Sequence, residues 1–124
     1  MHRRCAGPIG IGQKVIVRET LPNGVKLIAQ EMTGFRSVSM AVWIQAGSVY
    51  EIGAESGISH FIEHMVFKGT ESRSASDIAA EMDAVGGSIN AFTSKECTCF
   101  YAKVLDEDLP LAVDVLLDLS LIHI

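Results

Sequence analysis

Alternating apolar and polar residues predict several β-strands. In residues 37–46 every second residue is apolar, and the opposite face is only half polar. We therefore expect this strand to lie in the middle of a sheet. Asn23-Gly24 predicts a tight turn between the first two strands. The predicted strands are 15–18, 25–31, 37–46, 88–93 and 98–105.

Three segments have helical patterns. Residues 56–68 are apolar on almost every side, which is typical of a buried helix. Residues 74–85 are amphipathic, and Ser74 with Asp77 resembles a capping box. Asp108 is followed by a third apolar pattern with a proline in its first turn, which predicts a helix that begins there.

The order of these elements, β-β-β-α-α-β-β-α, predicts an α+β fold with a mostly antiparallel sheet and helices on one face. We expect residues 1–13 to form a loose N-terminal arm and residues 14–119 to form part of a domain. The chain stays apolar from Leu116 to its end without a cap, and we treat residues 120–124 as a doubtful tail. These features predict a fragment of a larger protein.

Composition narrows the class of protein. The 124 residues are 48% hydrophobic and 20% charged, which is typical of a globular fold and argues against disorder. The 10 basic and 15 acidic residues give a net charge of −5, which argues against a nucleic-acid partner. No apolar run is long enough to span a membrane, so we expect no membrane partner. Residues 1–18 contain basic residues and no acid, so a truncated organelle transit peptide stays an alternative for this segment.

Two of the three cysteines, Cys97 and Cys99, share one face of a predicted strand. They could form a metal-binding or redox pair. We favour two small side chains in the sheet, because an odd cysteine count does not indicate a disulfide framework.

The segment with the clearest chemistry is His60-Phe61-Ile62-Glu63-His64. Histidines four residues apart on a helix project from one face, within reach of one Zn²⁺ ion. Glu63 lies beside that face. Three polar side chains on an otherwise apolar helix need a compensating partner, and a divalent cation would supply one. The alternative is that they are ordinary surface or hydrogen-bonded residues.

The order HxxEH is the signature of the inverted zinc peptidases. The surrounding sequence, SGISHFIEHMVFKGT followed by GGSINAFTSKECTCFYAKV, resembles the N-terminal core of the pitrilysin-type peptidases. The similarity is greatest to the branch with the mitochondrial processing peptidase β subunit and its bacterial homologues. LPNGVKLIAQE and LDEDLPLAVDVLLDL also fit in order, so the resemblance covers about residues 15–119.

The resemblance implies a zinc metalloendopeptidase acting on extended peptides. His60 and His64 would be zinc ligands, and Glu63 would be the general base for a zinc-activated water. The segment Asn90-Ala91-Phe92-Thr93 matches the edge strand of the family that pairs with the peptide substrate. The alternative is a plain structural strand with Phe92 in the core.

The third ligand of the family is a glutamate roughly 70 to 80 residues after the second histidine, past the end of this chain. Glu81, Asp83 and Glu96 lie where solvated charges are expected, and His123 could serve only if the tail is native. We therefore expect this stretch alone to be inactive.

Two functions stay open for the complete protein. One is the zinc endopeptidase, and the alternative is a non-catalytic zinc-binding or structural subunit of a processing-peptidase-like complex. The resemblance allows a homodimer or a heterodimer, and it places the protein in the bacterial cytoplasm or, alternatively, in the mitochondrial matrix.

Overall fold

A computed structural model describes residues 15–121. The expected arm at 1–13 and the last three residues of the expected tail lie outside the described residues. The chain divides into two compact units, residues 1–35 and 36–124.

The first unit contains a β-hairpin. Strand β1 (Ile16–Thr20) pairs antiparallel with β2 (Lys26–Gln30). The turn lies at Asn23-Gly24, as predicted, and Gly24 has a φ of 90°, which glycine adopts without a Cβ clash. The Asn23 side chain accepts a hydrogen bond from the Val25 backbone N–H at 3.1 Å and so braces the turn.

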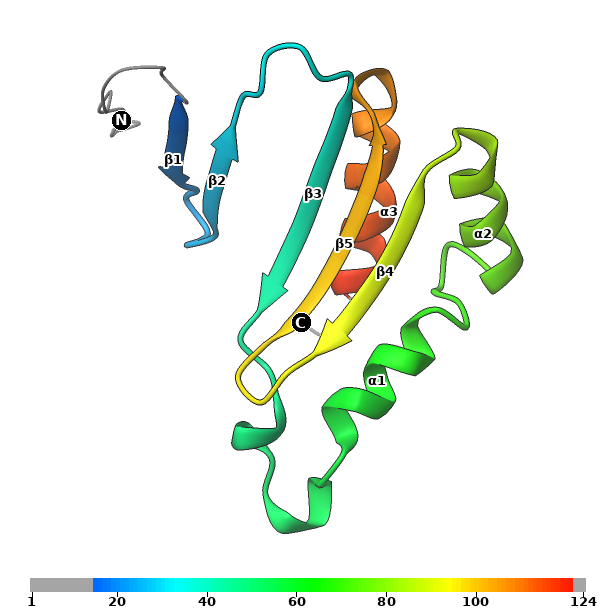
Figure 1. The fold of residues 1–124 in the computed structure, drawn as a ribbon. Helices are drawn as coiled ribbons and strands as arrows, with labels where there is room; N and C mark the ends of the chain where they lie inside the picture. The colour runs from blue at the N-terminus through cyan, green and yellow to red at the C-terminus, as the bar shows by residue number, and fades with distance from the viewer. Residues whose placement is uncertain (1–14, 122–124) are drawn as a thin grey trace. The chain divides into compact units, whose positions relative to one another are not determined.

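The second unit contains a three-stranded antiparallel sheet (Figure 1). Its strands are β3 (Ser37–Ile44), β4 (Ser88–Thr93) and β5 (Thr98–Leu105), in the order β3-β5-β4. The prediction that residues 37–46 form a central strand is wrong for this sheet, because β5 pairs on both sides. The half-apolar second face of β3 instead belongs to an exposed surface described below.

Three helices pack against one face of this sheet, which confirms the α+β fold class. They are α1 (Ile58–Val66), α2 (Ala75–Ala84) and α3 (Leu109–Leu121), with short 3-10 turns η1 (Ser48–Tyr50), η2 (Gly53–Glu55) and η3 (Asp106–Asp108) between elements. Their buried side chains form one core with the sheet. It comprises Val66, Ile78, Met82, Ala91, Phe100, Ala102, Val104, Ala112, Val115, Leu116 and Leu119.

Helix α2 begins as the sequence predicts. The Ser74 hydroxyl accepts a hydrogen bond from the Asp77 backbone N–H at 3.1 Å, and the Asp77 carboxylate accepts one from the Ser74 N–H at 2.9 Å. This capping box satisfies two groups that a helix end leaves free. The hydrogen bonds from Ser74 also hold the pKa of Asp77 below its ordinary value.

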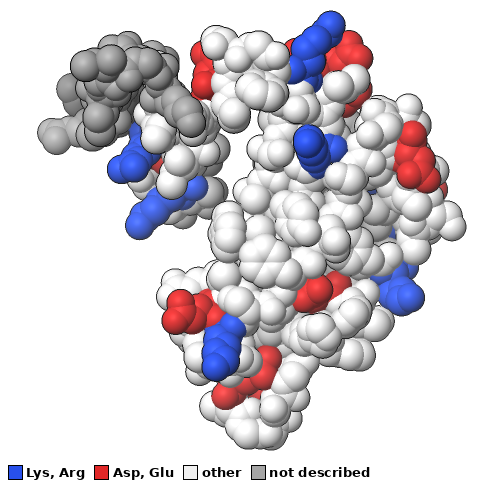
Figure 2. All heavy atoms as spheres, in the orientation of Figure 1, with Lys and Arg blue, Asp and Glu red and all other residues white. Residues whose placement is uncertain are grey.

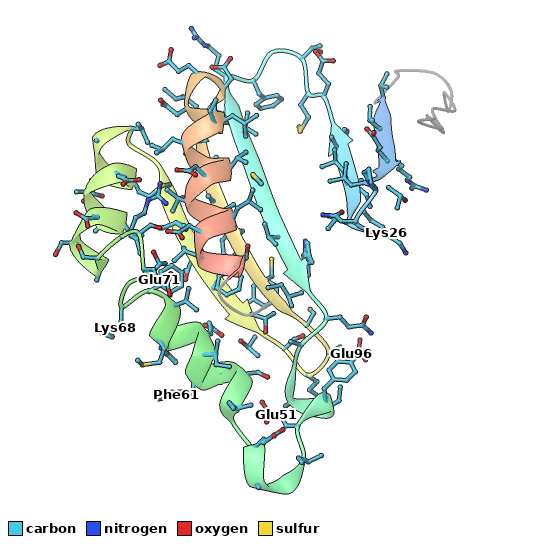
Figure 3. All side chains as sticks on the ribbon, turned by 180° about the vertical axis from the view of Figure 1, so that it is seen from behind. Lys26, Glu51, Phe61, Lys68, Glu71 and Glu96 are labelled. Atoms are coloured by element: carbon cyan, nitrogen blue, oxygen red, sulfur yellow. The ribbon has the colours of Figure 1, made fainter. Side chains whose placement is uncertain are left out.

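Helix α1 differs from its prediction as a fully buried helix. Val66 is its only buried residue, and Phe61 is 62% exposed, with its side chain pointing away from the sheet (Figure 3). Within the described residues, β4 is the strand that α1 contacts most, so only one stripe of the helix is covered. The apolar pattern of α1 therefore indicates the surface of the helix that could be buried. In this unit only part of that surface is buried.

The sheet face opposite the helices is exposed and carries three aromatic side chains. We call it the open face, defined by Trp43, Phe92 and Tyr101 on three adjacent strands. The Phe92 ring centroid lies 5.6 Å from that of Trp43 and 6.2 Å from that of Tyr101. Uncharged surface covers most of the region over these strands (Figure 2). Phe92 therefore contributes to a surface and not to the core.

Cys99 also points to the open face but is buried, between the strand partners Trp43 and Phe92. Burial raises the pKa of its thiol, and Cys97 adds to that shift. Both are free thiols, and Cys97 is half-buried. The prediction of two small side chains on one face of a strand is therefore right for Cys99 and wrong for Cys97, which lies in the turn before β5.

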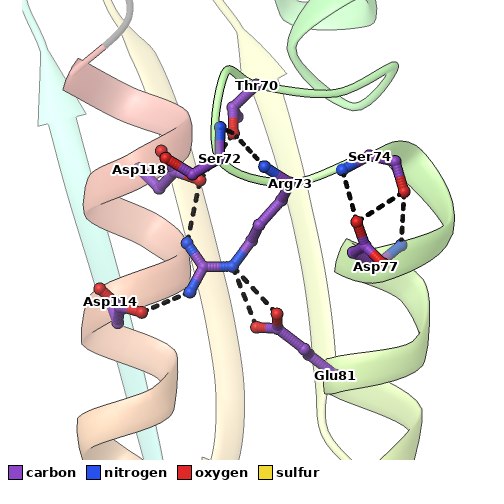
Figure 4. Close-up of polar contacts among 8 residues, drawn as sticks. All are labelled: Thr70, Ser72, Arg73, Ser74, Asp77, Glu81, Asp114 and Asp118. Carbon is purple, nitrogen blue, oxygen red and sulfur yellow. Dashed lines mark hydrogen bonds and ion pairs between the residues drawn. The ribbon is translucent and has the colours of Figure 1, made fainter.

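A half-buried arginine links the connection between α1 and α2 to α3 (Figure 4). The Arg73 guanidinium donates to Asp118 at 2.9 Å, to Glu81 at 3.0 Å and to Asp114. Asp118, followed by Asp114, raises the pKa of Arg73. The Thr70 hydroxyl donates to Asp118 at 2.8 Å as well. Charge-assisted bonds of this kind satisfy a side chain that is only 14% exposed.

Within residues 15–121, no helix is long and apolar enough to cross a membrane.

The buried Phe100 side chain gives the first testable prediction. Phe100→Ala removes a fully buried ring from β5, the central strand of the three-stranded sheet, and we expect it to lower the free energy of unfolding by about 3–5 kcal/mol. Urea denaturation followed by circular dichroism measures this loss. Tyr101→Ala is the matched control, because Tyr101 is the next residue and lies on the open face. Equal losses in the two variants would contradict the core described above.

Candidate metal centre

The two histidines of α1 converge. The Nε2 atoms of His60 and His64 lie 2.9 Å apart, with ring centroids 4.5 Å apart and nearly perpendicular. The helix produces this arrangement because residues four apart lie on one face. A tetrahedral zinc ion bound at about 2.0–2.1 Å needs its two nitrogens about 3.3 Å apart. The pair is therefore close to the spacing that a shared metal requires.

Glu63 lies on the inner side of the same helix. Its side chain is 14% exposed, whereas that of His60 is 67% exposed. The Thr93 hydroxyl of β4 donates a hydrogen bond to Glu63 Oε2 at 2.5 Å. The same oxygen lies 3.8 Å from His60 Nδ1. Glu63 is thus held beside the histidine pair by the sheet and not by the helix alone.

The predicted substrate segment forms most of β4. This strand lies at one edge of the three-stranded sheet, beside α1. Ala91 and Thr93 face the helices, while Asn90 and Phe92 face the other way. The edge of β4 that does not pair with β5 is open to a further strand within this sheet.

The described residues supply two candidate ligands and no third. Among residues 15–121, no group of three His, Cys, Asp or Glu side chains could hold a metal ion. The structure brings none of Glu81, Asp83 and Glu96 to the histidine pair, and Glu81 is bound to Arg73. His123 lies outside the described residues. Imidazole nitrogens and a nearby carboxylate are donor types that zinc accepts, so the residues present fit a partial zinc site.

Sequence reasoning missed two contacts of this site. One is the Thr93 hydroxyl, which was considered only as part of a substrate strand. The other is Glu51, whose carboxylate accepts backbone hydrogen bonds from Gly57 and Ser59 at the start of α1. The bond from Ser59, followed by the one from Gly57, holds the pKa of Glu51 below its ordinary value. Glu63 is a carboxylate in an otherwise apolar helix, so the sequence indicates that a hydrogen-bond donor lies near it. The sequence does not identify Thr93 as that donor.

A family model described as insulinase, peptidase family M16, matches residues 26–122. This chain belongs to that family. The match covers most of the chain, including every residue of the candidate metal centre and β4. Membership in peptidase family M16 confirms the pitrilysin-type resemblance that the HxxEH segment and its surroundings indicate.

Relatives within the family carry peptidase names. An uncharacterized zinc protease of Streptomyces coelicolor is 49% identical over 113 residues, covering 91% of this chain and 24% of the relative. An uncharacterized zinc protease of Bacillus subtilis is 52% identical over 105 residues, covering 85% of this chain and 26% of the relative. The mitochondrial-processing peptidase β subunit of Dictyostelium discoideum is 46% identical over 101 residues, covering 81% of this chain and 21% of the relative. The chain thus spans about a quarter of the length of these relatives.

The contact between Thr93 and Glu63 gives the second prediction. Thr93→Val removes the hydroxyl donor but keeps the β-branched shape, and it leaves a mostly buried carboxylate without that hydrogen bond. We expect the free energy of unfolding to fall by about 1.5–3 kcal/mol. Thr93→Ser, which retains the hydroxyl, is the control. Equal urea midpoints for the two variants would show that the hydrogen bond contributes nothing.

Proposed function

We propose that the whole protein is a zinc metalloendopeptidase that hydrolyses extended peptides. The observation that carries the proposal is the convergence of the two histidine Nε2 atoms beside a carboxylate held by β4. Membership in a peptidase family and the names of relatives as zinc proteases support it. His60 and His64 would hold the zinc, together with a ligand from outside the described residues.

Zinc, when bound, would supply Lewis acidity to the attacking water and to the carbonyl of the scissile bond. The residues of this chain would do the rest. Glu63 would accept a proton from the water and later donate it to the leaving amine nitrogen. The Thr93 hydroxyl would keep the Glu63 carboxylate in one orientation while it does so.

The edge of β4 would bind the substrate. An extended peptide can add to an unpaired strand edge through main-chain hydrogen bonds, and these bonds require no particular side chain in the peptide. The segment Asn90-Ala91-Phe92-Thr93 is at the sheet edge and ends at the residue that contacts Glu63. A peptide paired along this edge would therefore lie next to the proposed general base.

A second function is a zinc-binding or structural subunit without catalysis. The observation that keeps it open is the hydrogen bond from Thr93, which gives the Glu63 carboxylate a structural partner without any metal. This subunit would need Glu63 only as a partner of Thr93.

Glu63→Gln in the whole protein distinguishes the two functions. The amide has the size of the carboxylate but cannot serve as a base. We expect zinc content by mass spectrometry to be unchanged and hydrolysis of a fluorogenic peptide library to fall by about 10²–10⁴-fold. Glu71→Gln is the control, because Glu71 is an exposed carboxylate on the connection after α1. Cleavage by Glu63→Gln at the rate of the unsubstituted protein would refute the assigned role of Glu63. Zinc binding without cleavage in the unsubstituted protein would favour the subunit.

A further inference from the structure

No side chain at the N-cap position of helix α1 caps its N-terminus. Its N-cap residue is Gly57, which has a φ of 85° and offers no capping oxygen. The first hydrogen bond of the helix runs from the Phe61 N–H to the Gly57 carbonyl at 3.0 Å. The backbone N–H groups before Phe61 therefore need acceptors from outside the helix. In most helices a Ser, Thr, Asp or Asn at the N-cap would supply one.

Glu51 supplies the acceptors from six residues upstream. Its Oε2 accepts the Gly57 N–H at 2.7 Å, and its Oε1 accepts the Ser59 N–H at 2.9 Å. Glu51 lies in the loop that leads into α1 (Figure 3). One carboxylate thus satisfies two backbone groups at the start of the helix, and its negative charge lies at the positive end of the helix dipole.

The loop that carries Glu51 is itself fixed to the sheet. The Val49 N–H donates to the Lys95 carbonyl at 2.9 Å. Gly47 lies so close to the β4–β5 turn that a Cβ there would be 2.6 Å from the Ser94 carbonyl oxygen. This turn begins directly after Thr93, the residue that holds Glu63. The same hairpin therefore holds α1 at two points, its middle through Thr93 and its start through Glu51.

Packing contributes little at the start of the helix. A largely apolar cavity of about 130 Å³ lies beside the first turns of α1. It is lined by Ile44, Ala46, Ser59, Ile62 and Thr98. Ile58 and Phe61 in the same turn are exposed. Because close packing is incomplete here, the hydrogen bonds to Glu51 contribute directly to keeping the first turn in place.

We propose that Glu51 is a positioning residue for the candidate metal centre. His60 directly follows Ser59, whose N–H is bound to Glu51, and His64 lies one turn further along. If the first turn opens, His60 moves while His64 stays, and the two Nε2 atoms no longer converge. Glu51 thus sets the distance between the two candidate ligands without touching either. The proposal rests on the proposed function only in treating the histidine pair as a zinc site.

The test compares Glu51→Ala, Glu51→Gln and Glu55→Ala. Glutamine keeps one oxygen acceptor and should rescue part of the effect, which loss of charge alone would not predict. Glu55 provides the matched control, because it is an exposed acid just before α1 and no hydrogen bond or ion pair joins its side chain to residues 15–121. Amide hydrogen exchange is measured on the whole protein in its metal-free form. Zn²⁺ binding is measured on the same protein by calorimetry.

For Glu51→Ala we expect exchange at residues 58–62 to rise about 5- to 30-fold, as for loss of a helix cap, with exchange in α3 unchanged. Zinc affinity should fall by a similar factor. Glu51→Gln should lie between, and Glu55→Ala should match the unsubstituted protein. Unchanged exchange at 58–62 overturns the proposal, as does an equal rise in α3, which would indicate general destabilisation. If the unsubstituted protein binds no zinc, the proposed function fails, while the exchange pattern still decides whether Glu51 fixes the first turn of α1.

Discussion

The hydrogen bond between Thr93 and Glu63 joins the sheet to the helix that carries the candidate metal centre. It spans 30 residues of sequence and depends on the register of β4 against β5, which places Thr93 opposite Thr98 at the end of the hairpin. Because side chains alternate along a strand, a shift of one residue would turn the Thr93 hydroxyl to the open face. The antiparallel ladder, and the burial of Phe100 and Ala102 that fixes its register, therefore decide where Glu63 is held.

Helix α1 is also fixed beyond both of its ends. Before its start, Glu51 accepts the backbone N–H groups of Gly57 and Ser59. After its end, Thr70 and Arg73 bind the connection to α3 through Asp118. These contacts explain how a nine-residue helix with one buried residue can keep a defined position. Its own apolar surface contributes less, since much of it is exposed.

The sequence predicted the order and type of the elements because each has a local signal. The turn at Asn23-Gly24, the capping box of Ser74 with Asp77 and the two strands of the β4–β5 hairpin all lie where they were expected. The errors for β3 and α1 concern the partners that cover each element. The patterns of β3 and α1 predicted that both sides of each are covered, but apolar periodicity measures the area available for burial and does not identify the partner that covers it.

The candidate site was predictable in part for the same reason. The spacing of His60 and His64 determines that they share a helix face, so a local pattern was sufficient. Thr93 and Glu51 act through contacts that depend on tertiary structure, and sequence spacing could not predict them. The structure also changes the argument for a metal. The sequence argument for a compensating cation rests on the cost of polar groups on a buried helix, but His60 is exposed and Glu63 already has a donor in Thr93. Burial thus no longer requires a metal. What favours a metal is that the two Nε2 atoms, which lie within hydrogen-bond distance of each other, are also close to the spacing of two zinc ligands, beside a carboxylate whose orientation the sheet sets.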